Sequence, residues 1–269
     1  MKLKFIAITL AVSALAACSP SKKEKVTDDG SISARTPETE NLLAHLKKVS
    51  SRGFMFGHHD DTNYGIGWEG DEGCSDVKSV CGDYPAVISF DLGHLELGDT
   101  LSLDKVPFSK IRREILNQYK RGGLSSLSWH LRNPLTGGDS WDVSDTTVVK
   151  SILPGGVHHE KFAGWVSKVS AFINSLQTED GVKVPVLFRP WHEHTGSWFW
   201  WGEKLCTPEE YKALWHMTVD ILRGDGVDNA LYAYSPGGEP QDTAQYLKRY
   251  PGDDLIDVIG FDTYQFDRP

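Results

Sequence analysis

The chain alternates between short apolar runs and longer amphipathic segments from residue 36 onward. Each run is too short for a helix and is followed by polar residues, as expected of a buried β-strand. Six runs predict strands, at residues 54–57, 86–90, 124–128, 184–187, 231–234 and 257–261.

The segments between these runs predict helices, because their apolar residues recur every three or four positions. Two helix starts are marked by a threonine followed by a proline, at Thr36 and Thr207. Thr207 and Glu210 also have the spacing of a capping box. Further helices are expected around residues 109–120 and 161–176.

Strands that alternate with helices specify a parallel sheet, either a barrel or a doubly wound sheet. Polar and aromatic residues follow nearly every predicted strand, as at the C-terminal face of a barrel, and no glycine-rich nucleotide loop follows any of them. We therefore predict an α/β fold, a (β/α)8 TIM barrel. Because six strands are found, we expect the seventh and eighth to lie beyond Pro269 and this barrel to be incomplete.

The N-terminus has the pattern of an export signal. Lys2 and Lys4 precede an apolar segment, residues 5–14, that is too short to span a membrane. The sequence Leu-Ala-Ala-Cys that follows resembles a bacterial lipobox, in which Cys18 is lipidated. The alternative is a plain secretory signal in which Cys18 is incidental.

These features predict an exported, membrane-anchored lipoprotein of the periplasm or cell surface. Its expected parts are a signal peptide at 1–17, a flexible tether at 18–35 and the barrel domain at 36–269. Export places the chain in an oxidising compartment, where Cys74 and Cys81 are candidates for a small disulfide loop and Cys206 is left over. A zinc site made by these cysteines is disfavoured because no C-x-x-C pair exists.

Composition and charge limit the partners. The 269 residues are 39% hydrophobic, enough for one large domain, and carry a formal net charge of −9. An acidic chain without a basic run argues against nucleic acid as a partner and is compatible with a neutral polymer. The nine Trp, nine Tyr and eleven Phe residues suggest a ligand cleft with aromatic walls.

The segment 188–202 contains the most specific chemistry. It follows an apolar run and places Glu193 among the donors Arg189 and His192, directly before the aromatic residues 198–201. A carboxylic acid can protonate a glycosidic oxygen, donors fix hydroxyl groups, and flat rings stack on pyranose faces. The segment therefore predicts sugar chemistry.

Several segments together resemble glycoside hydrolase family 26, mostly β-mannanases of the retaining (β/α)8 clan. The resemblance covers residues 54–264 and rests on Gly57-His58, Trp129-His130, Asn133-Pro134, the segments 189–193 and 196–201, and the segment 260–264. Of these, the segment around Glu193 is highly specific.

The resemblance implies a retaining double displacement with Glu193 as general acid and base. The family's nucleophile is a second glutamate after strand seven, so we expect it to lie beyond Pro269. Two carboxylates roughly 5 Å apart are needed for this chemistry. The chain by itself is therefore expected to be inactive.

The resemblance also implies a set of substrate-site residues, and we expect neither a metal nor a cofactor. His130 and His192 would hydrogen-bond sugar hydroxyls, and Trp198 would stack on a sugar ring. Arg189 would orient carboxylates. Asp262 would contact substrate or support the site, and Tyr264 would hydrogen-bond the family's nucleophile and so have no partner here.

Other residues were open to two interpretations. Trp141 fits either a distant sugar platform or a plain surface turn. The pairs His58-His59 and His158-His159 are expected to be loop or rim histidines. His194-Thr195 stands where the family commonly has Met-Asn, a departure expected to alter the immediate sugar contacts.

Three functions compete on these residues. The first is an anchored enzyme that hydrolyses β-1,4-mannosidic bonds in β-mannan or mannooligosaccharides. The second is a metal-dependent barrel hydrolase, in which His192 and His194, or the paired histidines, would chelate zinc. The third is a lipid-anchored glycan-binding protein that keeps the cleft and lacks the nucleophile.

Overall fold

A computed structural model of the chain describes residues 35–264, all within one compact unit. The predicted signal peptide, Cys18 and all of the tether except Arg35 lie outside the described residues. The structure therefore bears on the predicted barrel domain.

Six parallel strands form the main sheet and follow one another in chain order. They are β1 (Gly57–His59), β4 (Val87–Asp91), β5 (Leu124–Ser128), β6 (Val186–Arg189), β7 (Ala230–Tyr234) and β8 (Val258–Ile259). Among residues 35–264, β1 and β8 are the two edges of this sheet. Sequential parallel strands joined through helices are the order of a (β/α)8 barrel, so the predicted fold class is confirmed, with six strands in the described residues.

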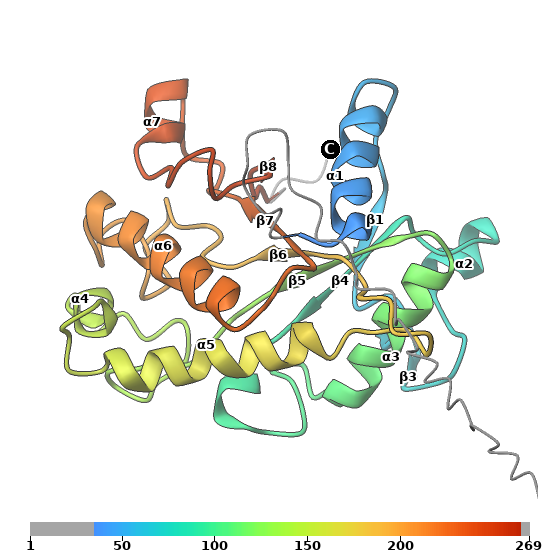
Figure 1. The fold of residues 1–269 in the computed structure, drawn as a ribbon, viewed down its shortest axis with the longest axis horizontal. Helices are drawn as coiled ribbons and strands as arrows, with labels where there is room; N and C mark the ends of the chain where they lie inside the picture. The colour runs from blue at the N-terminus through green and yellow to red at the C-terminus, as the bar shows by residue number, and fades with distance from the viewer. Residues whose placement is uncertain (1–34, 265–269) are drawn as a thin grey trace, which may run out of the picture. The chain divides into compact units, whose positions relative to one another are not determined.

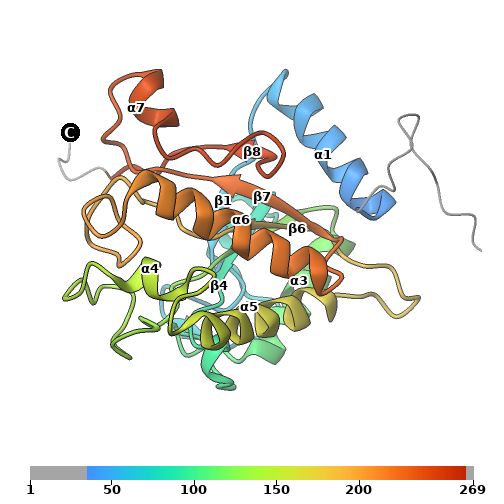
Figure 2. The ribbon, with the colours of Figure 1, turned by 60° about the vertical axis from the view of Figure 1, so that its left-hand side comes forward.

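Four long helices accompany the strands: α1 (Pro37–Ser50), α3 (Phe108–Lys120), α5 (His159–Asn174) and α6 (Pro208–Gly224). In Figure 1, α3, α5 and α6 surround the strands that run through the middle of the view. Figure 2 shows α5 and α6 side by side, in agreement with their direct contact. No helix within the described range is both long enough and apolar enough to cross a membrane.

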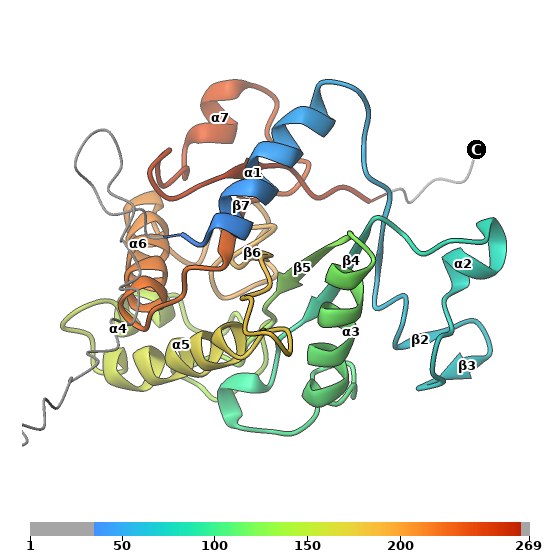
Figure 3. The ribbon, with the colours of Figure 1, turned by 45° about the vertical axis from the view of Figure 1, so that its right-hand side comes forward.

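Shorter elements were not predicted. They are the helices α2 (Asp76–Cys81), α4 (Val148–Ile152) and α7 (Thr243–Leu247), the 3-10 turn η1 (Leu95–Leu97), and an antiparallel hairpin of β2 (Tyr64–Gly65) and β3 (Trp68–Glu69). Figure 3 shows this hairpin beside α2. The two are joined by the Trp68 indole, which donates to Asp76 at 2.7 Å.

The helix starts agree with the sequence. The Thr36 side chain accepts a hydrogen bond from the Thr39 amide at the start of α1. At the start of α6, Thr207 and Glu210 form both hydrogen bonds of a capping box. Each cap satisfies amides that the first helical turn leaves unpaired.

The core lies between the sheet and these helices. Apolar side chains of α3, α5 and α6 pack on it, among them Ile111, Val166 and Leu214, which are almost completely buried. Two buried indoles, Trp129 just after β5 and Trp191 just after β6, pack against each other. The segments that follow β5 and β6 are therefore anchored in the apolar core by these two side chains.

Some predicted boundaries were wrong by a few residues. The first strand was expected at 54–57, whereas β1 begins at Gly57 and Phe54 is exposed. The two strands approach closely at Gly57, where a Cβ would lie 3.1 Å from the Val87 Cβ, so this position favours glycine. The strands expected at 184–187 and 257–261 are 186–189 and 258–259, and the helix expected at 161–176 is 159–174.

The expected disulfide between Cys74 and Cys81 is wrong, since both thiols are free. Cys81 is the last residue of α2, and Cys74 lies two residues before its first residue, so the whole helix up to Cys81 lies between the two thiols. Cys206 is free and buried, as expected.

Candidate active site

The sequence-predicted site residues lie together around one cleft at the carboxyl ends of the strands. The cleft has a volume of about 940 Å³. Its lining includes all seven predicted residues within the described range: His130, Arg189, His192, Glu193, Trp198, Asp262 and Tyr264.

A strained turn after β6 places Glu193 in the cleft. Trp191 and Glu193 both have positive φ angles, 55° and 53°, which side-chain-bearing residues rarely adopt. The turn is held at each end, since the Tyr211 hydroxyl donates to the Trp191 carbonyl at 2.7 Å and the Glu193 amide donates to the Ser235 carbonyl at 2.8 Å. The surrounding fold therefore fixes where Glu193 points.

The Glu193 carboxylate is held by two neutral donors. The Trp198 indole donates to Oε2 at 2.8 Å, and the Tyr264 hydroxyl donates to Oε1. The expectation that Tyr264 has no partner is thus wrong, because its ring reaches across the cleft to Glu193. This hydrogen bond, together with partial burial, raises the pKa of Tyr264 to about 12. The phenol consequently stays protonated at neutral pH.

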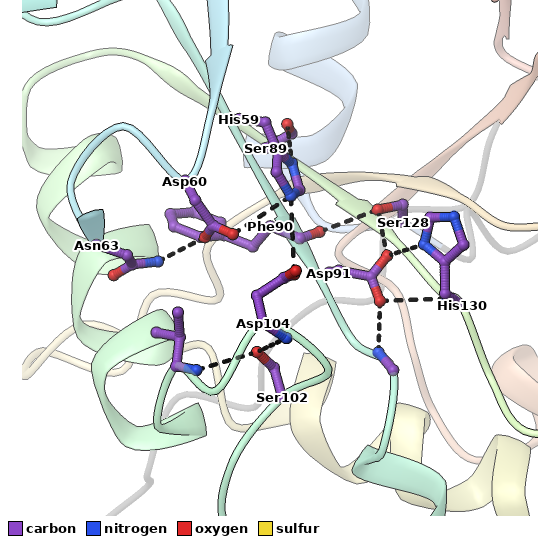
Figure 4. Close-up of polar contacts among 12 residues, drawn as sticks. His59, Asp60, Asn63, Ser89, Phe90, Asp91, Ser102, Asp104, Ser128 and His130 are labelled. Atoms are coloured by element: carbon purple, nitrogen blue, oxygen red, sulfur yellow. Dashed lines mark hydrogen bonds and ion pairs between the residues drawn. The ribbon is translucent and has the colours of Figure 1, made fainter. Parts of the chain in front are cut away.

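His130 and His192 form one hydrogen-bonded group with Asp91. His130 Nδ1 lies 2.6 Å from the Asp91 carboxylate, and its Nε2 lies 3.1 Å from His192 Nε2 (Figure 4 shows the Asp91–His130 contact). Burial, then the nearby Arg189 guanidinium and His130, lower the pKa of His192 well below its ordinary value. His192 is therefore neutral and carries a single ring proton.

Arg189 binds a carboxylate, as expected. Its Nη1 donates to both oxygens of Asp262, at 3.0 and 2.9 Å, and Asp262 also accepts from the Ser235 hydroxyl at 2.5 Å. Burial raises the pKa of Asp262, while the Arg189 charge opposes that rise. The pair links the end of β6 to the segment after β8.

Aromatic rings form the walls of the cleft. Trp198 and Trp141 are 38% and 47% exposed and both line it. The Trp141 ring stacks on His130 with their centroids 5.4 Å apart. Phe199 is a buried wall residue, whereas Trp200 and Trp201 belong to the core.

His59 and Glu239 line the cleft and were missed as site residues. His59 ends β1, and its Nδ1 lies 2.7 Å from the Ser89 hydroxyl, as Figure 4 shows. His58 next to it does not line the cleft, as the alternation of a strand requires. The position of His59 at the end of a strand is the sequence signal that marks it as a cleft residue. The pair is predicted from the sequence only as loop or rim histidines.

The departure at His194-Thr195 has a different effect from the one expected. His194 is buried between the rings of Tyr211 and Tyr234 and does not line the cleft. Thr195 acts indirectly: its hydroxyl donates to the Glu239 carboxylate at 2.6 Å and accepts from the Gly237 amide. Thr195 thus helps to place Glu239, and neither His194 nor Thr195 lines the cleft.

Within residues 35–264, one trio of His and carboxylate side chains comes close enough to hold a metal ion: His59, Asp60 and Asp104, whose ligand atoms lie within 4.8 Å of one another. The trio includes neither His192 nor His194. The predicted zinc chelate at those two histidines therefore has no geometric support.

The order of strands and helices, with an acid at the mouth of the fourth parallel strand, places this protein among the α/β-barrel glycoside hydrolases. The chain belongs to glycosyl hydrolase family 26, whose sequence profile matches residues 32–268. The resemblance found in the sequence is confirmed.

Similar proteins support this assignment. A mannan endo-1,4-β-mannosidase of Bifidobacterium adolescentis is 38% identical over 86% of this chain and 23% of its own length. One from Bacillus subtilis is 28% identical over 85% of this chain and 64% of its own length. The chain thus spans less than two thirds of either relative.

Solved structures agree. A GH26 β-mannanase from Bacteroides ovatus has a TM-score of 0.86 and 62% identity, over 87% of this chain and 68% of that one. An endo-β-1,4-mannanase double mutant from Cellulomonas fimi has a TM-score of 0.80 and 36% identity, over 87% of this chain and 53% of that one.

Proposed function

We propose that this chain forms the substrate cleft of an enzyme that hydrolyses β-1,4-mannosidic bonds, with Glu193 as general acid and base. The observation that carries the proposal is the position of Glu193, a residue that is 7% exposed and whose carboxylate is held in the cleft by Trp198 and Tyr264. The names of the relatives from Bifidobacterium, Bacillus and Bacteroides supply the substrate class.

In the proposed reaction Glu193 gives its proton to the glycosidic oxygen as the bond to the leaving sugar breaks. A second carboxylate attacks the anomeric carbon and forms a glycosyl–enzyme ester. Glu193 then takes a proton from water, which attacks the same carbon and releases the sugar with its configuration retained.

We propose that the second carboxylate comes from a segment that the longer relatives have beyond the part matched here. Two other acids line the cleft within the described residues, and both are engaged. Asp262 is paired with Arg189, and Glu239 accepts from Thr195.

The test is mannan hydrolysis by the chain extended with the C-terminal segment of the Bacteroides ovatus relative. Glu193→Ala is expected to lower kcat roughly 10²–10⁴-fold, because it removes general acid catalysis. Glu203→Ala is the matched control: Glu203 is an exposed acid of the same loop that pairs with Lys248 outside the cleft. On an aryl mannoside whose leaving group needs no proton, azide is expected to restore part of the lost rate, because it attacks the glycosyl–enzyme in place of water without a general base and gives the mannosyl azide. Full activity of Glu193→Ala would sink the proposal.

The alternative, glycan binding without hydrolysis, uses the same cleft and is favoured if the extended chain binds mannopentaose and releases no product. Isothermal titration of the chain with mannopentaose, alongside reducing-sugar release by the extended chain, separates the two functions. Trp198→Ala is expected to weaken binding in either case, because the ring is exposed on the cleft wall.

We also propose that the protein is an exported lipoprotein anchored through Cys18. Support comes from the sequence pattern before Cys18. Cys18→Ala is expected to abolish palmitate labelling and to move the protein from the membrane to the soluble fraction. Membrane recovery of the unlabelled variant would contradict the anchor.

A further inference from the structure

We propose that Asp91 is a positioning residue that fixes which ring nitrogen carries the proton in His130 and, through His130, in His192. The inference goes beyond the proposed function. The assignment of the ring protons does not depend on the proposed function, whereas its consequence for sugar binding rests on the mannan-binding cleft proposed above.

The Asp91 carboxylate is buried and saturated with donors at the end of β4. Its side chain is 2% exposed. Oδ1 accepts from two backbone amides, Gly93 at 2.7 Å and His130 at 3.2 Å. Oδ2 accepts from the Ser128 hydroxyl at 2.6 Å and lies 2.6 Å from His130 Nδ1 (Figure 4).

An ionised carboxylate accepts hydrogen bonds and donates none, so Nδ1 of His130 must carry a proton. Burial alone would raise the pKa of Asp91, but the contact with His130 and the donors Ser128 and Gly93 together hold it below its ordinary value. The carboxylate is therefore an acceptor at neutral pH.

The tautomer of His130 also determines the tautomer of His192. The two Nε2 atoms are 3.1 Å apart, a separation that requires one proton between them. When His130 carries its one ring proton at Nδ1, its Nε2 is a lone pair, and His192 must then donate from Nε2. His192 Nδ1 is buried and has no hydrogen-bond partner among the described residues. The contact with His130 is thus what selects the tautomer of His192, the residue next to Glu193.

The surroundings of His130 offer no competing ionic partner within residues 35–264. Asp91 faces it from β4, Ser128 lies beside it on β5, and His192 comes from the turn after β6. The rings of Trp141 and Phe199 also pack against it.

Asp91→Asn provides a directional test, because the two oxygens of Asp91 are not equivalent. The backbone amides at Oδ1 cannot be reversed, so the asparagine oxygen must take that place. Its NH2 group then faces His130 Nδ1, which must accept. His130 becomes protonated at Nε2 and His192 at Nδ1, so both tautomers are exchanged, as with asparagine in place of the aspartate of a serine-protease triad.

The measurement is long-range ¹H–¹⁵N NMR of the ¹⁵N-histidine-labelled chain, which reads the tautomer of each ring. The wild type is expected to show His130 protonated at Nδ1 and His192 at Nε2, and Asp91→Asn the reverse in both. Asp60→Asn is the matched control: Asp60 is a buried aspartate next to His59 that makes no contact with His130. It is expected to leave both tautomers unchanged.

His130 protonated at Nε2 alone in the wild type overturns the proposal, and so do unchanged tautomers in Asp91→Asn. The wild-type spectrum decides the matter even if the variant does not fold. Mannopentaose titration adds the functional arm, where Asp91→Asn is expected to weaken binding about 10-fold or more while the fold is retained. Equal affinity with exchanged tautomers removes the role in binding. Absence of binding by the wild type refutes the proposed function and leaves the tautomer result standing.

Discussion

Glu193 is held by an indole and a phenol, two donors that carry no charge. Neutral donors orient a carboxylate without the strong stabilisation of its ionised form that a lysine or arginine would give. Arg189 lines the cleft and lies four residues before Glu193 in the sequence, but it is paired with Asp262. The residue proposed to move a proton therefore has no ion pair among the described residues.

Tyr264 should titrate late because of its bond to Glu193. Its pKa is raised from the ordinary value of 10 to about 12, so the favourable bond is present below pH 10 and is lost as the pH rises through about 12. Spectrophotometric titration of the wild type minus Tyr264→Phe isolates this ring from the other tyrosines. The difference curve is expected to have its midpoint near 12. A midpoint at 10 would show that the bond does not persist in solution.

At the scale of elements, one buried cation fastens the loop between β6 and α6. Arg249 follows α7 and donates to the carbonyls of His194 at 2.9 Å, Trp201 at 3.2 Å and Cys206 at 2.5 Å. Its cation also lies over the Tyr211 ring. These bonds tie the two ends of the loop that carries Glu193 to one side chain.

Arg249→Met is expected to destabilise the protein by about 3 kcal/mol or more, because it keeps an apolar stem but leaves several buried carbonyls unpaired. Urea unfolding measures the loss. Arg223→Met is the control, since Arg223 makes one exposed bond to the Asp254 carbonyl, and a change below about 0.5 kcal/mol is expected. Equal losses in the two variants would argue against the fastening role.

The capping box of α6 makes a second element-scale prediction. Thr207→Ala removes the acceptor for the Glu210 amide and is expected to cost about 1 kcal/mol of unfolding free energy. Thr147→Ala is matched to it, because Thr147 is the N-cap of α4 and makes no side-chain cap hydrogen bond. The control should lose clearly less, and a loss as large as that of Thr207→Ala would contradict the role of the cap.

The periodicity of the sequence predicted the long elements well, because their buried faces repeat over several turns or strand residues. Leu124–Ser128 was predicted to the residue, since it is buried throughout. The β2–β3 hairpin and α2 were missed because they are short and bury little, so their sequence has no apolar period. Phe54 was misleading: it extends the apolar run but is exposed in the structure.

The site was predictable where a side chain directly follows a strand, as His130 and Glu193 do. It was not predictable where the contact is between distant segments. Thr195 and Glu239 are 44 residues apart, and no local pattern marks them as partners. Tyr264 was recognised by its motif, but its bond to Glu193 spans 71 residues and appears only in the fold.

At the scale of the molecule, both edges of the described sheet expose apolar side chains. Phe56 lies next to β1, and Ile259 and Phe261 lie in and after β8; all three are more than half exposed. Unpaired strand edges with apolar residues favour association with other chains.

The isolated chain is therefore expected to self-associate as its concentration rises, and light scattering after size exclusion measures its mass. Phe261→Lys should shift the distribution toward monomer. Val157→Lys is the control, because Val157 is 86% exposed between α4 and α5, away from both edges. If the wild type stays monomeric at 100 µM or more, or the control acts as strongly, the edges are not the cause.

The proton carried by Glu193 is the centre of the proposed activity, and the leaving group tests it most directly. The measurement compares kcat/KM of the extended chain and its Glu193→Ala variant on mannopentaose and on a dinitrophenyl β-mannobioside. Dinitrophenolate departs without a proton, so we expect a loss of roughly 10²–10⁴-fold on mannopentaose and a far smaller loss on the aryl substrate. Equal losses on the two substrates, or none on mannopentaose, would contradict the role given to this residue.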